Sequence, residues 1–254
     1  MSEHIHLDVS GAIGRLTLRR PDKLNALTLA MIDALDAACA TLERSAHVRA
    51  VIVDSANEKA FCSGADIKEW GELGAKDMWR TWTRLGHRVF DRLATLPQPT
   101  IAAINGLALG GGLELALACD LRVATSDSGF ALPEASVGTI PGWGGTRRLT
   151  RLIGPGRAKS LIFRASGIDA ATAMAWGLVE EVVPRAELAT RALAIAEEIA
   201  QRSPDSLQLS KQLIDGDAGG LSAETIAAGL ALAMPNGQEG AEAFRTKRGP
   251  RFTD

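Results

Sequence analysis

Residues 101–119 read IAAINGLALGGGLELALAC, an apolar run that contains three adjacent glycines and one carboxylate, Glu114. Successive glycines weaken regular structure, so we expect the chain to turn at Gly110–Gly112. The turn divides the run into a buried strand, predicted at 100–104, and a buried helix, predicted at 111–118. A membrane span of similar length is the competing interpretation, but a charge at mid-bilayer is expensive and the glycines also argue against it.

The segments on either side alternate between short apolar strands and helical patterns. Thr28 is the expected N-cap of a helix that ends near Leu42. The other expected elements are a hairpin of strands at 5–9 and 13–18, strands at 50–53, 120–125 and 178–183, and helices at 79–93 and 141–153. This alternation predicts an α/β architecture. Beyond Arg202-Ser203-Pro204 the pattern is all-helical, which indicates a boundary there.

The composition excludes several classes of protein. Among the 254 residues, 46% are apolar and 23% are charged, which is enough for a core and argues against disorder. The net charge of −2 gives no basic excess to hold a nucleic-acid backbone. Three cysteines without a CxxC motif favour a reduced compartment. The first 25 residues contain no apolar stretch of signal-peptide length, so we expect a cytoplasmic location.

Motifs for several chemistries are missing from the sequence. The four histidines form no HExxH motif, and we expect no metal site. There is no GxSxG elbow and no dinucleotide fingerprint, and residues 154–160 lack the glycine that precedes the lysine of a Walker A loop. Any catalysis would therefore use carboxylates and backbone groups.

The start of the predicted 111–118 helix is a candidate ligand site. Backbone amides at a helix N-terminus are unpaired and positively polarised, which suits an anion or a developing anion. Glu114 lies among leucines in this helix, and burial raises the pKa of such a carboxylate toward the range of general acid–base catalysis. The alternative is a tight strand–helix turn in which Glu114 forms a buried ion pair. The residues by themselves leave both interpretations open.

A second carboxylate, Glu134, follows Pro133 and precedes a cluster of Gly and Pro at 138–146. A rigid loop there would hold Glu134 opposite Glu114. Two carboxylates around one water can add or remove water, and two carboxylates can equally cleave a glycosidic bond. The spacing does not decide, although a chain without tyrosine is poor in the aromatic platforms of sugar sites. Alone, Glu134 is also explained as a loop carboxylate that caps the predicted helix 141–153.

Four stretches make the chain resemble the enoyl-CoA hydratase/isomerase (crotonase) superfamily over nearly its whole length. They are residues 59–68 (KAFCSGADIK), 99–120 with the glycine triplet, 132–149, and 244–248 (FRTKR). The resemblance implies an α/β fold, with a crotonase-like spiral of ββα units as the catalytic core in residues 1–202. It also implies a helical C-terminal trimerisation region in residues 203–254. We therefore expect a homotrimer or a hexamer (a dimer of trimers), with no nucleic-acid or membrane partner.

The resemblance is strongest to an enoyl-CoA hydratase of fatty-acid β-oxidation, with an acyl-CoA thioester as substrate. It implies no cofactor, since coenzyme A is part of the substrate. The amides of Ala65 and Gly111 would form an oxyanion hole for the thioester carbonyl. Glu114 would activate water for attack at C3, and Glu134 would supply the proton at C2.

The resemblance also implies a set of binding residues. The coenzyme A groove would be lined by Ser63, Ala65, Asp66, Ile67 and Lys68. Phe244 and Lys247 would contact coenzyme A, often from a neighbouring subunit, although Lys247 is also explained as a solvated surface charge. Trp143 departs from the small residue of some short-chain hydratases. With Trp70, Trp79 and Trp82 it would shape the acyl pocket, or else these indoles pack in the core or at an interface.

Two alternatives to a hydratase remain at this point. One is an enoyl-CoA isomerase or another acyl-CoA dehydratase or lyase of the same superfamily. The other is a non-catalytic binding protein built on the crotonase fold. The presence of both glutamates favours hydration and dehydration, because many relatives with other activities replace one of them.

Overall fold

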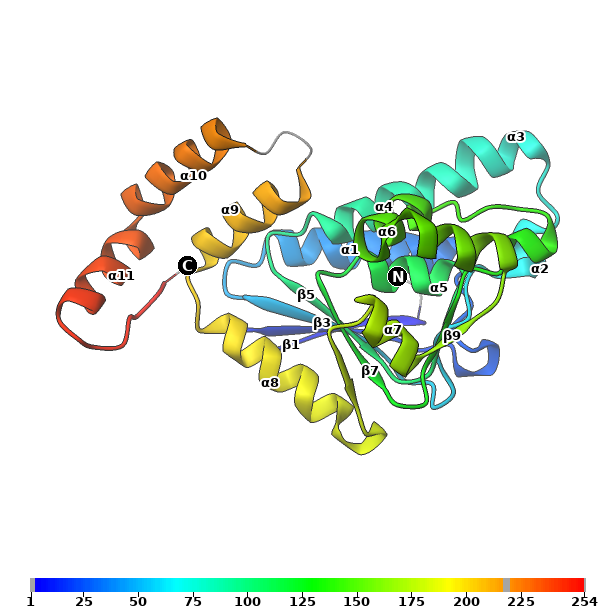
Figure 1. The fold of residues 1–254 in the computed structure, drawn as a ribbon, viewed down its shortest axis with the longest axis horizontal. Helices are drawn as coiled ribbons and strands as arrows, with labels where there is room; N and C mark the ends of the chain where they lie inside the picture. Colours follow the sequence, from blue (N-terminus) through cyan, green and yellow to red (C-terminus); the bar gives the residue numbers. More distant parts are fainter. Residues whose placement is uncertain (1–2, 217–219, 254) are drawn as a thin grey trace.

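Two sheets form the framework of the molecule (Figure 1). The computed structural model describes residues 3–216 and 220–253. The catalytic core expected at 1–202 and the helical region expected at 203–254 therefore each include a few residues that lie outside the described ones, namely 1–2, 217–219 and 254. Within the described part, the larger sheet has the order β1-β2-β3-β5-β7-β10, made of Ile5–Ser10, Ile13–Leu18, Ala50–Ser55, Thr100–Ile104, Leu121–Thr125 and Glu181–Val183. The smaller sheet has the order β4-β6-β8-β9, made of Ala60–Cys62, Leu107–Leu109, Gly129–Ala131 and Ile168–Asp169.

From β3 to β8, successive strands alternate between the two sheets. Strands β3, β5 and β7 are parallel neighbours in the larger sheet, and β4, β6 and β8 are parallel neighbours in the smaller one. Each pass of the chain thus adds one strand to each sheet, which is the expected ββα spiral. The strands β4, β6 and β8 have three residues each, too few to give a readable period in the sequence. The predicted hairpin is confirmed as the antiparallel pair β1 and β2.

Strand β3 shows why its sequence is continuously apolar. Ala50 and Ile52 pack against α8 (Leu188–Ala200), whereas Val51 and Val53 belong to the main core on the opposite face. Alternate residues of a strand point to opposite faces, so a strand covered on both sides needs apolar residues throughout. Figure 1 shows α8 on one side of the larger sheet and the helices α1 (Leu29–Glu43) and α4 (Arg84–Ala94) on the other.

The helices largely follow their sequence signals. The Thr28 hydroxyl accepts a hydrogen bond from the Met31 amide at 3.2 Å, as expected of an N-cap. The predicted 79–93 helix consists of α3 (Ala75–Asp77), a π-helical segment (Met78–Thr83) and α4. The predicted 141–153 helix begins later than expected, at Gly145, while its expected end at 153 coincides with a kink inside α6 (Gly145–Arg164). The chain kinks at Gly154, with φ 79°, and Pro155 then restarts the helix, a position that proline favours.

The shorter helices include the one predicted from the glycine run. Helix α5 is Gly111–Leu117, and the remaining short helices of the core are α2 (Ile67–Trp70) and α7 (Ala170–Trp176). Short 3-10 turns occupy Pro21–Lys23, Glu134–Val137 and Arg185–Glu187. Within the part of the chain that the structure describes, no helix has the length and apolarity to cross a bilayer.

The C-terminal helices form an arm beside the core (Figure 1). They are α9 (Pro204–Asp215), α10 (Leu221–Ala233) and α11 (Pro235–Arg245), as the helical pattern predicted, whereas residues 246–253 form no helix. The Lys211 ammonium pairs with Asp120 at 2.8 Å and ties α9 to the core. The Arg49 guanidinium donates to the carbonyl oxygens of Ala200 and Phe252, which holds the end of the chain to the core. The role of this arm in assembly stays a prediction.

Candidate active site

A cavity of about 490 Å³ lies at the N-terminal end of α5. Its walls come from the loop after β4, from α5, from the π-helical segment and from residues 133–143. The cavity collects most of the residues that were expected at the site, namely Ser63, Ala65, Ile67, Gly111, Glu114, Glu134 and Trp143, together with Trp70, Trp79 and Trp82. The fold therefore brings together segments that are about 80 residues apart in the sequence at one place.

The glycines allow two loops to approach each other closely. A Cβ on Gly112 would lie 2.1 Å from the Cys62 carbonyl oxygen, and a Cβ on Gly64 would lie 2.9 Å from the Leu109 carbonyl oxygen. Gly110 has φ 51°, a conformation that favours glycine, and its amide donates to the Ala131 carbonyl at 2.9 Å. A side chain at Gly64 or Gly112 would therefore push the segment 62–64 away from the segment 109–112.

This approach places the Ala65 and Gly111 amides beside each other. A Cβ on Gly111 would lie 3.4 Å from the Ala65 nitrogen. Within the described residues, neither amide donates a hydrogen bond to the protein. Gly111 is the first residue of α5, where the amide is also polarised by the helix. Two such donors facing one cavity suit an oxygen on which negative charge develops.

Glu114 is buried at the inner end of the cavity, with 2% of its surface exposed. Its Oε1 accepts hydrogen bonds from the Trp143 and Gly145 amides, each at 2.7 Å, and no described residue donates to its Oε2. Burial raises the pKa of Glu114 to about 7, with the negative charge of Glu134 adding to the rise and the two amides opposing it. The buried ion pair, the alternative explanation of this glutamate, does not form among the described residues. The carboxylate is thus fixed by one oxygen and ready to exchange a proton near neutral pH.

Glu134 lies across the cavity in the turn Glu134–Val137. One of its oxygens rests against Gly110, where a Cβ would lie 2.8 Å from Oε1, and the buried Oε2 has no hydrogen-bond partner among the described residues. Burial raises the pKa of this carboxyl group too. The two carboxyl groups that a rigid loop was expected to hold opposite each other therefore line one cavity.

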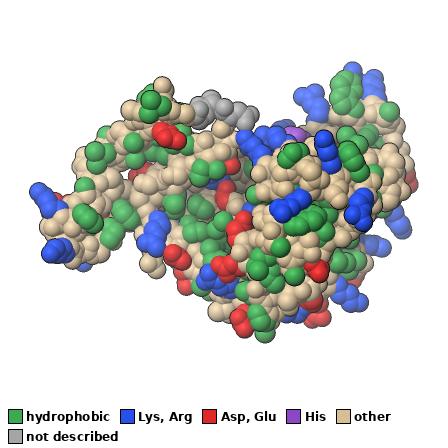
Figure 2. All heavy atoms as spheres, viewed as in Figure 1, with side chains coloured by type: hydrophobic (Ala, Val, Ile, Leu, Met, Phe, Trp, Pro, Cys, Tyr) green, Lys and Arg blue, Asp and Glu red, His purple; other side chains and the backbone are tan. Residues whose placement is uncertain are grey.

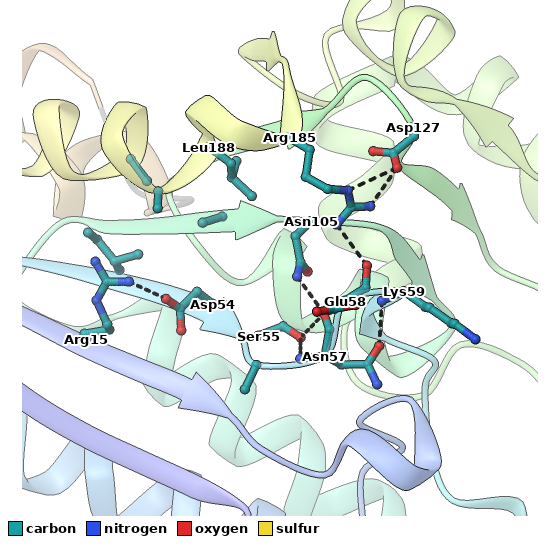
Figure 3. A pocket seen from close by; sticks show the side chains of 15 residues that line it. Arg15, Asp54, Ser55, Asn57, Glu58, Lys59, Asn105, Asp127, Arg185 and Leu188 are labelled. Carbon is teal, nitrogen blue, oxygen red and sulfur yellow. Dashed lines mark hydrogen bonds and ion pairs between the residues drawn. The ribbon is translucent and has the colours of Figure 1, made fainter.

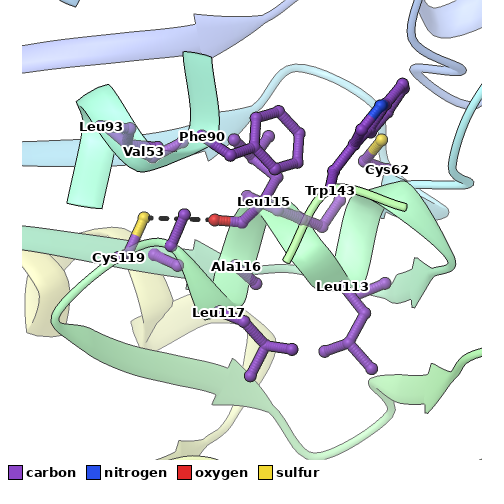
Figure 4. Packing of buried hydrophobic residues seen from close by; sticks show 14 of the residues in the cluster. Val53, Cys62, Phe90, Leu93, Leu113, Leu115, Ala116, Leu117, Cys119 and Trp143 are labelled. Carbon is purple, nitrogen blue, oxygen red and sulfur yellow. Dashed lines mark hydrogen bonds between the residues drawn. The ribbon is translucent and has the colours of Figure 1, made fainter. Parts of the chain in front are cut away.

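Trp143 forms the wall of the cavity next to Gly111. Its ring centroid lies 5.6 Å from that of Trp82 and 5.3 Å from that of Phe90, the latter edge-on. A Cβ on Gly86 or on Gly111 would lie within 2.6 Å of the indole, so both glycines make room for the ring. Figure 4 shows the indole beside α5, with Phe90 close to Leu115. Trp143 therefore both packs in the core and closes the cavity, while Trp79 is 64% exposed at its rim.

Four expected binding residues lie outside the cavity. The Asp66 carboxylate caps α2 by accepting from the Lys68 amide at 3.0 Å and pairs with Arg20 at 2.6 Å. Lys68 is exposed beside it. Phe244, with 89% of its surface exposed, and Lys247 lie at the end of α11 in the arm. A single chain does not bring these two to the cavity.

Sequence reasoning missed the residues that hold Glu114. The donor amides of Trp143 and Gly145 lie in a loop that turns at Gly144, where φ is 103°. Arg148 lies beneath this loop and donates to the Trp143 carbonyl at 2.9 Å. A Gly-Gly pair followed three residues later by a basic residue is the signal in the sequence that could have pointed to this contact.

A second and larger cavity, of about 880 Å³, lies between α8 and the ends of β3 and β5 (Figure 3). Four of its charged side chains form two ion pairs, Arg15 with Asp54 and Arg185 with Asp127, each at 2.7 Å. It contains none of the residues expected at the site. Within residues 3–216 and 220–253, no three His, Cys, Asp or Glu side chains gather so as to hold a metal ion.

The smaller cavity has the parts of an acid–base enzyme site that stabilises an oxyanion: two free amides and two carboxyl groups with raised pKa. A family model described as "Enoyl-CoA hydratase/isomerase" matches residues 8–254, and the chain belongs to this family. It is 43% identical over 212 residues to the short-chain-enoyl-CoA hydratase of Clostridium acetobutylicum, covering 84% of this chain and 81% of that one. It is 38% identical to the crotonyl-CoA hydratase of Syntrophomonas wolfei, covering 98% of each.

The solved structures agree with this assignment. The crystal structure of an enoyl-CoA hydratase from Bacillus anthracis has a TM-score of 0.93 and 39% identity to this chain, with 99% of both chains covered. A chain titled enoyl-CoA hydratase/carnithine racemase from Magnetospirillum magneticum has a TM-score of 0.93 at 33% identity, covering 100% of this chain and 96% of that one. The ββα spiral is thus the fold of the family and not a chance arrangement of two sheets.

Proposed function

We propose that this protein is an enoyl-CoA hydratase, which adds water reversibly across the 2,3 double bond of a 2-enoyl-CoA thioester. The observation that carries the proposal is the placement of Glu114 and Glu134 around one cavity that also receives the free amides of Ala65 and Gly111. The names of relatives at about 40% identity support the same reaction. No step needs a cofactor beyond the coenzyme A that the substrate carries.

The four groups divide the reaction between them. The thioester oxygen binds between the Ala65 and Gly111 amides, which stabilise the enolate that forms when oxygen adds to C3. Glu114, held through Oε1, uses its other oxygen to take a proton from the attacking water. Glu134 gives a proton to C2. A group with a pKa of about 7 can accept and return protons near neutral pH, which suits a reversible addition.

The direct test is the hydration of crotonyl-CoA, followed by the loss of absorbance of the conjugated thioester. We expect turnover by the wild-type chain without added metal. A panel of 2-enoyl and 3-enoyl thioesters in the same assay separates hydration from isomerisation. Absence of hydration on the whole 2-enoyl panel would refute the proposal, and double-bond migration without hydration would assign the site to an isomerase.

We propose as well that the arm of α9–α11 assembles the chain into a trimer or a dimer of trimers. The arm exposes several large apolar side chains to solvent. Each of the following is more than 60% exposed: Ile214, Leu221, Ile226, Leu232 and Phe244. Figure 2 shows such side chains spread over the arm. Exposed apolar area of this kind favours association. In such an assembly Phe244 and Lys247 could reach the coenzyme A of a neighbour, and a monomer in sedimentation velocity would exclude this.

A further inference from the structure

Arg148 contacts the peptide segment that holds Glu114. It lies in the first turn of α6, and only 8% of its surface is exposed. One guanidinium nitrogen donates to the Trp143 carbonyl oxygen at 2.9 Å, and the other donates to Asp91 of α4 at 2.5 Å. The planar guanidinium group donates in two fixed directions, so it connects the loop to α4 at a defined distance.

The loop 143–145 is held from both sides. On one side the Trp143 and Gly145 amides donate to Glu114, and on the other the Trp143 carbonyl accepts from Arg148. Gly144 has φ 103°, and a Cβ there would lie 2.2 Å from the Arg148 nitrogen. The guanidinium therefore fills the place that a side chain at 144 would need.

Asp91 compensates the buried charge of Arg148. A buried cation is costly unless a carboxylate and further acceptors satisfy it, and here Asp91 and the Trp143 carbonyl do so. Asp91 also pairs with the exposed Arg147 at 3.0 Å and with the half-buried His87 at 3.2 Å. Arg147 shares the partner of Arg148, but among the described residues its side chain donates no hydrogen bond to the loop.

We propose that Arg148, held by Asp91, is a positioning residue that aligns the loop 143–145 and thereby orients Glu114 for proton transfer. The inference rests on the proposed function, in which Glu114 takes the proton of the attacking water. The positive charge of Arg148 has a second effect, which favours the carboxylate form of Glu114. It lowers the pKa of Glu114 and so opposes the effect of burial.

The test compares Arg148→Met, Arg148→Lys and the matched control Arg147→Met in crotonyl-CoA hydration. Misplacing a catalytic group by a fraction of an ångström to 1 Å costs up to about 100-fold in rate, so kcat of Arg148→Met should fall at least ten-fold with KM nearly unchanged. Its acidic limb, the rise of kcat with pH, should move to higher pH because the carboxylate loses a nearby positive charge. Arg148→Lys keeps the charge, so its limb should stay in place while kcat recovers in part. Arg147→Met should match the wild type within two-fold.

A merely structural Arg148 would give a different result. The proposal is overturned if the folded Arg148→Met or Arg148→Lys keeps the kcat of the wild type, or if Arg147→Met loses as much. It is also overturned if Arg148→Met lowers kcat while the acidic limb stays in place. If Arg148→Met does not fold, the kcat of Arg148→Lys and Arg147→Met decides by the same criteria.

A thermodynamic cycle keeps this inference separate from the proposed function. Glu114→Gln is introduced into the wild type and into Arg148→Lys and Arg148→Met, and urea unfolding is measured at pH 8. If Arg148 stabilises the Glu114 carboxylate, removing the carboxylate should raise the urea midpoint more in Arg148→Met than in the wild type. Equal increases would refute the coupling even if the protein hydrates no enoyl-CoA at all.

Discussion

Replacement of Glu114 by glutamine should make the protein more stable while abolishing its activity. The pKa of this carboxyl group rises from its ordinary 4.5 to about 7 on folding. A carboxylate with a raised pKa is more costly in the folded protein than in the unfolded chain. The free energy of unfolding is therefore highest below about pH 4.5, where Glu114 is protonated in both the folded and the unfolded state. This stability is lost as the pH rises to about 7. Glutamine has nearly the same shape, can accept from the same two amides, and carries no charge at any pH.

The magnitude follows from the size of the shift. Between 4.5 and about 7, at about 1.4 kcal/mol for each unit, the charged carboxylate costs the folded state about 3 kcal/mol at pH 8. We expect Glu114→Gln to raise the free energy of unfolding by about this amount at pH 8, and by much less at pH 5. Urea unfolding of both proteins at pH 5 and at pH 8, at one protein concentration, measures this difference in the free energy of unfolding.

Glu181→Gln is the control of opposite sign. Glu181 pairs with Arg191 at 2.6 Å on the surface, and the hydrogen bond from Arg191 lowers its pKa. Its replacement should lower stability by less than about 1 kcal/mol, as is usual for an exposed ion pair. The reasoning would be refuted if Glu114→Gln were no more stable than the wild type at pH 8, or if its gain were the same at pH 5 and pH 8.

Four further predictions concern the site and its walls. Glu134→Gln should lower kcat for hydration about 100-fold through loss of the proton at C2, and a near-normal kcat would contradict the two-carboxylate scheme. Trp143→Phe keeps the backbone amide that donates to Glu114 but enlarges the cavity. The ratio of kcat/KM for long-chain thioesters to kcat/KM for short-chain thioesters should therefore rise about ten-fold. An unchanged ratio would show that another wall of the cavity limits chain length. Gly112→Ala has no space beside Cys62 and should cost about 1–3 kcal/mol in urea unfolding, whereas Gly229→Ala on α10 has open space and should cost nothing. The three buried cysteines, with pKa raised to about 12, should resist thiol reagents at neutral pH until the chain is unfolded, as mass spectrometry can show.

The sequence was informative where a signal is local. The cap at Thr28, the glycine turn before α5 and the position of Glu114 among leucines are all properties of adjacent residues. The raised pKa of Glu114 could also be predicted, because its main cause is burial in its own apolar helix. These features need no knowledge of the rest of the chain.

The parts that the sequence did not show depend on distant segments. The amides that bind Glu114 are 29 and 31 residues away, and their direction depends on the backbone at Gly144. The pairing of Ala65 with Gly111 came from resemblance, since no periodicity relates residues so far apart. The same resemblance placed Asp66 among the binding residues, and its carboxylate is turned to Arg20 and the start of α2.

The complete burial of the seven-residue helix α5 has a consequence for how this protein can change over time. Trp143 and Cys62 leave no room for a Cβ at Gly111 and Gly112, so substitutions of these two glycines cost the fold and the reaction together. The outer rim of the cavity is different, since Ile67, Trp79 and Ile140 are each at least 60% exposed. New substrates can therefore be acquired by mutation of the rim, where changes are structurally cheap, while the inherited chemistry stays fixed inside.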